Sequence, residues 1–388
     1  MALIFVFLFS SGIVLLVCPL SVFAQTDKVY TSENNFYPPD PKISRDIFTQ
    51  ILSPGGQTIE VLMEAARVSA ERNLFAEAHI FTSMHLKALK EKKRLIGPPM
   101  AEYLYSAGNV YNEQGRYDVA LMYLSRAQES IPGYGDVSFL LKSRVLRGLG
   151  TAWWGKGDFH RSIRHFSAAK EIMLNNGMAK TPEYGILLSG MGTSYWLTRD
   201  VKSAAEYFRK SKDVFENSGF KSGDGYADLL QNIGVLYSFV DRDDDALDYY
   251  GKAKKIRDDL DFKFTSDYAS LANNIGLIHH SKKDAVRALE YFNMSLEIRE
   301  RLKLKRTPGY AVLLNNLGLA HWSKGEKELT LARFLEARKL SEELGLAETL
   351  DFANLLRNLG FVYYDMGERV RGDECILRAE KIQSRPGK

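Results

Sequence analysis

The chain has 388 residues, of which 45% are hydrophobic and 26% are charged, enough for a large core or a long repeat array. Lys and Arg number 52 against 48 Asp and Glu, and this small excess does not indicate a nucleic-acid-binding protein. The only cysteines are Cys18, in an apolar N-terminal run, and Cys375. No disulfide can therefore form within the rest of the chain, and we expect Cys375 to be a half-buried small apolar residue in a helix.

The first 24 residues predict an export signal. Residues 2–24 carry no charged side chain, and the stretch Val22-Phe23-Ala24 suits cleavage by signal peptidase before Gln25. The apolar run is also long enough to remain in the membrane, so the alternative is an anchor formed by residues 2–24. Either way we expect an exported protein, periplasmic or extracellular, that touches a membrane only through this segment.

Residues 25–58 predict a flexible lead-in and the start of the first helix, because three prolines and the pair Asn34-Asn35 fall before residue 42. A fixed 42-residue period governs the chain beyond this segment. It places glycine, without insertion or deletion, at Gly108, Gly150, Gly192, Gly234, Gly276, Gly318 and Gly360. A ring or imidazole follows each glycine after three residues, a small side chain after twelve and a large apolar one after sixteen.

Within each period, apolar residues recur at helical spacing over two segments that a short turn separates. Each 42-residue repeat therefore predicts two antiparallel helices, with the glycine and the small residues allowing their close approach. One such hairpin cannot bury its apolar face alone, but stacked hairpins can, and this is typical of a solenoid.

This pattern resembles the tetratricopeptide repeat, in the 42-residue form found in kinesin light chain, from about Ile59 to the C-terminus. The resemblance implies an all-α fold, a right-handed superhelical solenoid of about eight antiparallel helix pairs over residues 59–388. Seven clear repeats are centred on the glycines, and a degenerate one is centred on Ala66. It also implies a scaffold or adaptor that binds a peptide or protein segment.

Helix starts can also be read from the repeat. A threonine lies eleven residues before four of the glycines, at Thr181, Thr265, Thr307 and Thr349, where its hydroxyl can cap the next helix. Proline follows two of these threonines, at Pro182 and Pro308, and suits the first helical position because the missing N–H has no partner there. These signals fix where the first helix of each repeat begins.

Motifs for catalysis, metal binding or cofactor binding were sought and are absent from the sequence. His279 and His280 are neighbours, but His279 occupies the ring position of its repeat, and we expect it to pack between helices. The acidic run from Asp241 lacks the glycine and the glutamate of a calcium loop and predicts a turn and helix start instead. We therefore expect no catalytic residue, no metal and no cofactor.

The inner, concave face of such a solenoid is formed by the first helices of the repeats. In kinesin light chain-like arrays, asparagines near the glycine face this groove and bind a peptide backbone. The resemblance assigns this role to Asn232, Asn273, Asn274, Asn315, Asn316 and Asn358, with Arg357 at the matching place in the last repeat. Four residues after the glycine, Trp154, Trp196, His280, Trp322 and Tyr364 are expected to turn toward the same face.

Two other interpretations stay open. The asparagines can instead tie neighbouring helices together, because an amide both donates and accepts hydrogen bonds. The whole array can also serve as a self-assembling structure that associates through its ends as a homo-oligomer, while a cryptic enzyme is the least favoured interpretation. A protein or peptide partner, and no nucleic acid, is expected.

Overall fold

The computed structural model describes residues 7–9, 12–14, 98–113, 115–131 and 136–384. The lead-in of residues 25–58, the degenerate repeat at Ala66 and most of the N-terminal segment lie outside these residues. Within that segment, strand β1 (Phe7–Phe9) pairs antiparallel with β2 (Gly12–Val14), two short strands that the sequence did not predict. Among the helices that the structure describes, none combines the length and the hydropathy needed to cross a membrane.

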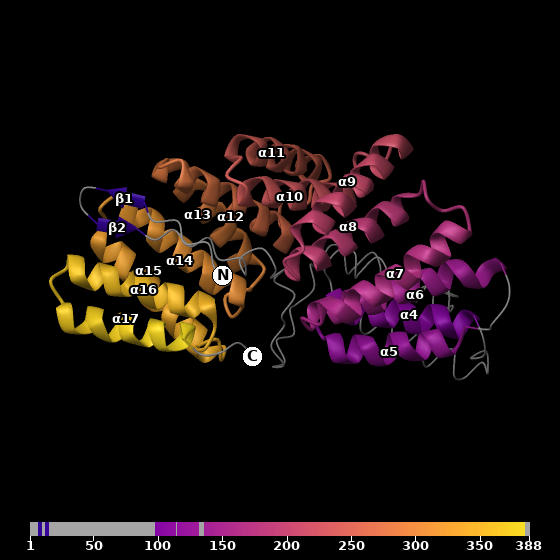
Figure 1. Cartoon of the computed structure of the whole chain (residues 1–388), viewed down its shortest axis with the longest axis horizontal. Coiled ribbons are helices and arrows are strands. Elements are labelled where there is room, and N and C mark those ends of the chain that lie inside the picture. The colour runs from indigo at the N-terminus through magenta and orange to yellow at the C-terminus, as the bar shows by residue number, and fades with distance from the viewer. Residues whose placement is uncertain (1–6, 10–11, 15–97, 114, 132–135, 385–388) are drawn as a thin grey trace, which may run out of the picture. The chain divides into compact units, whose positions relative to one another are not determined.

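Fourteen helices make up the rest of the described chain, and they alternate as first and second helices of the repeats (Figure 1). They are α4 (Pro98–Glu113), α5 (Tyr117–Glu129), α6 (Asp136–Gly155), α7 (Phe159–Asn175), α8 (Pro182–Leu197), α9 (Val201–Ser218), α10 (Asp224–Phe239), α11 (Asp243–Asp259), α12 (Ser266–Ser281), α13 (Ala285–Arg301), α14 (Pro308–Ser323), α15 (Lys327–Glu343), α16 (Leu350–Asp365) and α17 (Arg369–Gln383). The predicted all-α solenoid of paired helices is confirmed over these residues.

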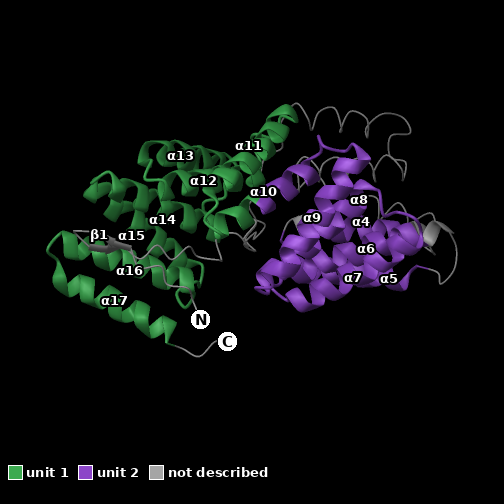
Figure 2. Cartoon of the chain, turned by 45° about the horizontal axis from the view of Figure 1, so that its top comes forward, with its two compact units in different colours: residues 1–27, 234–388 green, residues 28–233 purple. Residues whose placement is uncertain are grey.

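The chain divides into two compact units, which are described separately (Figure 2). Unit 2 comprises residues 28–233, and within it α4 pairs with α5, α6 with α7, and α8 with α9. Unit 1 comprises residues 1–27 and 234–388, and within it α12 pairs with α13, α14 with α15, and α16 with α17. In each unit the second helix of a hairpin also packs on the first helix of the next, so neighbouring repeats share one core.

The repeated glycine provides room for the large apolar residue that follows it by sixteen positions. A Cβ on Gly276 of α12 would lie 2.6 Å from ring carbons of Phe292 in α13, and a Cβ on Gly318 would overlap the ring of Phe334. The same apposition recurs in every described repeat, with Leu124 and Ile376 as the large residue at the two ends of the described array. The repeated glycine and the large apolar residue sixteen positions later therefore pack against each other in each hairpin.

The predicted helix starts are confirmed. The hydroxyls of Thr181, Thr265, Thr307 and Thr349 each accept a hydrogen bond from the backbone N–H three residues later, at the N-termini of α8, α12, α14 and α16. The acidic run from Asp241 forms a turn and the first turn of α11, as expected. Cys375 is more deeply placed than expected, because it is buried in α17, and burial raises the pKa of its thiol.

In four of the described repeats, the ring that follows the glycine by three residues stacks on a tyrosine ring of the second helix. Tyr111 stacks on Tyr123 at a centroid distance of 5.3 Å, and His279 stacks on Tyr291 at 5.6 Å with the ring planes 7° apart. The imidazole of His279 thus takes the packing role predicted for it. Burial also holds the pKa of His279 below its ordinary value, which favours the neutral ring.

Tyrosines at the start of three first helices, Tyr226, Tyr268 and Tyr310, bond to the preceding second helix. The hydroxyl of Tyr310 donates to Glu300 Oε1 at 3.0 Å, and the hydroxyl of Tyr268 donates to Asp258 Oδ1 at 2.7 Å. Hydrogen bonds from Lys305 and Tyr310 lower the pKa of Glu300 below its ordinary value. These bonds connect α12 to α11 and α14 to α13.

The turn inside each hairpin holds one residue in the left-handed backbone region, seven positions after the glycine. Glycine fills this place at Gly157, but Arg199 fills it in the next repeat with φ 65°.

We expect Arg199→Gly to raise the free energy of unfolding by about 0.5–1 kcal/mol, because relief of the Cβ strain exceeds the entropy that glycine adds to the unfolded chain. The matched exchange Gly157→Arg, with open space at its Cβ, should lower it by about 1 kcal/mol. Urea denaturation of both variants measures the difference, and shifts of the same sign would contradict the assignment.

Candidate functional site

Four of the predicted asparagines in unit 1 form hydrogen bonds between consecutive first helices. Asn316 Nδ2 in α14 donates to Asn273 Oδ1 in α12 at 2.9 Å. Asn358 Nδ2 in α16 donates to Asn315 Oδ1 in α14 at 3.0 Å. We name these four side chains the asparagine ladder. The ladder links α12, α14 and α16, so the asparagines do tie neighbouring helices together.

Burial divides the asparagines into two groups. Asn273, Asn274 and Asn316 are buried, with 6%, 6% and 4% of their surface exposed, whereas Asn315 and Asn358 are half-buried. The buried pair is therefore mainly an interhelix link, because little of either amide can reach a ligand. The half-buried pair keeps Asn315 Nδ2 and Asn358 Oδ1 for further bonds.

Arg357 stands where the ladder would continue. Its Nη2 donates to Gln383 Oε1 in α17 at 2.6 Å, within its own repeat. A guanidinium has no acceptor atom, so it cannot receive an amide N–H as Asn273 and Asn315 do. The series of asparagine pairs therefore does not extend to Arg357, whose side chain bonds to α17 of its own hairpin.

In unit 2 the amides contact other groups. Asn232 Nδ2 donates to Thr193 Oγ1 at 3.4 Å, a long bond between α10 and α8. Asn112 Nδ2 in α4 donates to the carbonyl oxygen of Gly148 in α6 at 3.0 Å, and Asn112 is only 3% exposed. Asn112 was not among the predicted site residues, although it occupies the same repeat position as Trp154. Its side chain is smaller than the aromatic side chains at this position in other repeats, and the prediction selected only the large ones.

The five large side chains predicted for the groove do not share one environment. Trp196 is buried, with 6% exposed, whereas Trp154 and Trp322 are half-buried and Tyr364 is 37% exposed. The hydroxyl of Tyr364 donates to Asp373 Oδ1 at 2.7 Å, and its ring covers Gly372 in α17. Trp154 and Trp322 are the tryptophans of this position that keep accessible ring surface.

His280 lies between two first helices of unit 1. Its Nε2 is 3.1 Å from Ser323 Oγ in α14. Burial lowers the pKa of His280, so the imidazole is neutral at physiological pH and can donate one hydrogen bond and accept another. This arrangement suits interhelix bonding.

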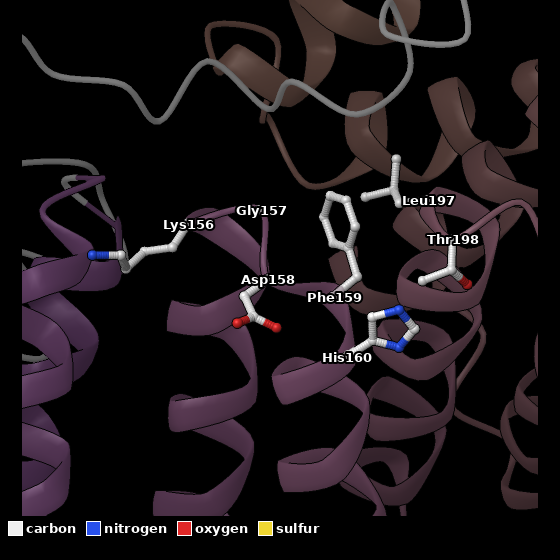
Figure 3. A pocket seen from close by; sticks show the side chains of 7 residues that line it. All are labelled: Lys156, Gly157, Asp158, Phe159, His160, Leu197 and Thr198. Carbon is white, nitrogen blue, oxygen red and sulfur yellow. The ribbon is translucent and has the colours of Figure 1, made fainter. Parts of the chain in front are cut away.

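A shallow pocket of about 520 Å³ opens where two hairpin turns of unit 2 meet (Figure 3). Phe159 at the start of α7 and Leu197 at the end of α8 supply its apolar wall, and Thr198 and His160 supply polar edges. The Asp158 side chain caps the N-terminus of α7, where its Oδ1 accepts a hydrogen bond from the backbone N–H of Arg161 at 2.9 Å. The pocket offers space for an apolar side chain.

Comparison with known proteins identifies the repeat. One tetratricopeptide repeat model matches residues 183–259 and 267–343, and a second matches residues 101–134. No curated protein sequence matches the chain. The matched segments follow the 42-residue register, which continues through α16 and α17.

Solved structures share the fold. The Cut9–Hcn1 hetero-tetramer of the APC/C has a TM-score of 0.63 at 14% identity, covering 91% of this chain and 58% of that one. A Rap protein complexed with Competence and Sporulation Factor has a TM-score of 0.58 at 13% identity, covering 84% and 97%. Apo RapI has a TM-score of 0.55 at 11% identity, covering 84% and 97%. At these identities the likeness concerns the fold alone, while the family models show that residues 101–134, 183–259 and 267–343 form tetratricopeptide repeats.

Proposed function

We propose that this protein is a non-enzymatic scaffold that binds an extended segment of a partner protein along its first helices. The half-buried pair Asn315 and Asn358 is the observation that carries the proposal. The ladder uses one donor of Asn358 and the acceptor of Asn315, which leaves Asn315 Nδ2 and Asn358 Oδ1 for a ligand. A donor and an acceptor on neighbouring helices match the N–H and C=O groups of an extended main chain.

Two further features support this function. Trp322 precedes the turn at the end of α14 with part of its ring accessible, and tryptophan is a residue type enriched at binding hot spots. Among solved structures of similar fold, the Rap protein is complexed with Competence and Sporulation Factor. Scaffolds of this kind work by binding, so the proposal requires no catalytic group, metal or cofactor.

We further propose that the protein is exported to the periplasm or the cell exterior after cleavage before Gln25. The apolar run of residues 2–24 and the small residue Ala24 support this location. N-terminal sequencing of the protein from its host tests it, because a mature chain would begin at Gln25. An intact Met1 on membrane-bound protein would favour the anchor formed by residues 2–24.

A displayed library of random peptides tests the binding function. We expect the full-length chain to select peptides, and Asn315→Ala/Asn358→Ala to weaken them by about fivefold or more, because each lost hydrogen bond contributes about 0.5–1.5 kcal/mol. Asn293→Ala is the matched control, since Asn293 is exposed on the second helix α13. Calorimetric titration of a selected peptide against the variants measures the effect.

Two results would count against this function. The first is the absence of any selected peptide together with a molar mass in solution that rises with concentration, which would favour a self-assembling array. The second is equal affinity of the double variant and the Asn293→Ala control, which would move the binding surface away from the ladder.

A further inference from the structure

The first helices of unit 2 carry a face whose chemistry differs from that of the asparagine ladder. On α6, Arg144, Arg147, Thr151 and Trp154 are spaced by three, four and three residues, so they lie along one stripe of the helix. The neighbouring helix α4 contributes Tyr105, Asn109 and Asn112. We name these seven residues the α4–α6 face.

Contacts between the helices join the two halves of the face. Arg147 Nη2 lies 3.5 Å from the hydroxyl of Tyr105, and Asn112 Nδ2 donates to the Gly148 carbonyl. Asn109 Oδ1 lies 3.1 Å from the point that a Cβ on Gly148 would occupy. The absence of a side chain at Gly148 thus lets Asn109 of α4 approach the backbone of α6 closely.

Two buried polar atoms of this face have no hydrogen-bond partner within the described chain. They are the acceptor Asn112 Oδ1 and the donor Trp154 Nε1, which occupy the same repeat position in consecutive helices. An unsatisfied buried donor or acceptor destabilises a protein by about 1–3 kcal/mol, and native structures contain few of them. Both atoms are buried in the ligand-free protein, so a peptide group of a ligand, with an N–H for Asn112 and a C=O for Trp154, reaches them only when these side chains turn outward.

The charges of the face are also uncompensated. Arg144 is exposed and Arg147 is half-buried, and neither has a carboxylate within 4.0 Å among the ion pairs of the described residues. Glu102 of α4 occupies the repeat position of Arg144, yet the two form no ion pair there. On α8 the matching stripe consists of Ile186, Ser189, Thr193 and Trp196, which carry no charge. The face therefore presents two guanidinium groups to its ligand.

We propose that the α4–α6 face binds an acidic segment of the partner protein in an extended conformation. Carboxylates of the segment pair with Arg144 and Arg147, whose planar guanidinium groups suit two-pronged hydrogen bonds to a carboxylate. The main chain of the segment bonds to Asn112 Oδ1 and Trp154 Nε1. This inference rests on the proposed scaffold function and specifies the ligand chemistry of unit 2.

Two labelled peptides of about twelve residues, about 40 Å when extended, serve as probes for the full-length chain. One alternates Glu and Asp with small residues, and the other replaces each Glu and Asp by Gln and Asn. We expect the acidic peptide to bind at least about tenfold more tightly than its amide counterpart, with an affinity that falls as salt rises. Fluorescence anisotropy measures both affinities.

Charge-matched variants locate the site. Arg144→Gln/Arg147→Gln should weaken the acidic peptide by about tenfold or more, because charge-assisted bonds are lost. Arg126→Gln/Arg164→Gln removes the same charge from exposed positions on the second helices α5 and α7, and should change the affinity by less than about twofold. Equal losses in the two double variants would overturn the proposal, as would equal binding of the two peptides.

Trp154→Phe tests the main-chain contact, because it removes the N–H and keeps most of the ring. We expect acidic-peptide affinity to fall about threefold or more. An unchanged affinity with a raised melting temperature would show that the indole N–H only destabilises the fold, and would overturn this contact.

Competition with a single-stranded oligonucleotide of the same charge tests whether the face attracts anions in general. Equal competition by the oligonucleotide would also overturn the proposal.

Failure of this inference is distinguishable from failure of the scaffold function. Library peptides whose affinity depends on Asn315 and Asn358, but not on Arg144 and Arg147, would leave the scaffold function standing and remove the acidic segment. The absence of any selected library peptide would remove the scaffold function itself.

Discussion

Replacing Phe334 by alanine is expected to lower the free energy of unfolding of unit 1 by about 3–5 kcal/mol, the largest single effect that the structure predicts. The ring of Phe334 has no exposed surface, and it fills the space that Gly318 leaves between α14 and α15. Alanine would leave a cavity between two helices whose glycine cannot extend to fill it. Urea denaturation of the variant, followed by circular dichroism, measures the loss.

The glycine on the other side of this contact provides the check. Gly318→Ala would place a methyl group against the Phe334 ring and should lower the free energy of unfolding by about 1–3 kcal/mol. Gly251→Ala in α11, with open space at its Cβ, should instead raise it by about 1 kcal/mol, because alanine favours helix. In the Phe334→Ala background the penalty of Gly318→Ala should vanish, since its methyl group then enters the cavity. A stabilising Gly318→Ala in the wild-type background would contradict the packing assigned to the repeated glycine.

Asn316→Ala is expected to have the next largest effect, a loss of about 1–3 kcal/mol in the free energy of unfolding. The substitution leaves Asn273 Oδ1 buried between α12 and α14 without the donor that now lies 2.9 Å away. Asn358→Ala breaks the equivalent bond of the half-buried pair, where water can replace the lost donor, so we expect about 0.5–1 kcal/mol. Thermal unfolding of the two variants ranks them.

A double-mutant cycle isolates the ladder bond from other effects. Asn273→Ala/Asn316→Ala removes both partners, and its loss should be smaller than the sum of the two single losses, because no unpaired buried amide remains. If Asn316→Ala left the melting temperature unchanged, the bond from Asn316 to Asn273 would not contribute to stability, and the interhelix role assigned to it would be wrong.

Much of the fold can be predicted from the sequence because its signals are local or periodic. Thr307 and Pro308 predict the start of α14 through bonds that span a few residues. The glycine and the large apolar residue sixteen positions later predict a helix hairpin, since both lie within one repeat. The ring position of His279 predicts its packing for the same reason, and the structure confirms it on Tyr291.

The candidate site could be predicted only in part. The ladder joins residues 43 apart, such as Asn273 and Asn316, and the 42-residue columns place these two side chains in different columns. Which amides meet depends on how far neighbouring helices are displaced along their axes, and no single repeat contains that information. Arg144 and Arg147 were missed because the sequence offers no sign that carboxylates are absent around them.

By itself, the sequence determined the helix pairs, their caps and the 42-residue register, because each depends on contacts within one repeat or on its identical copy. Only the tertiary structure decided which side chains remain accessible. Trp154 and Trp196 occupy equivalent repeat positions, yet Trp154 is half-buried with an unpaired indole N–H and Trp196 is buried. The physical reason is that exposure and pairing depend on the side chains of the adjacent repeats, which differ between repeats even where the repeated positions agree.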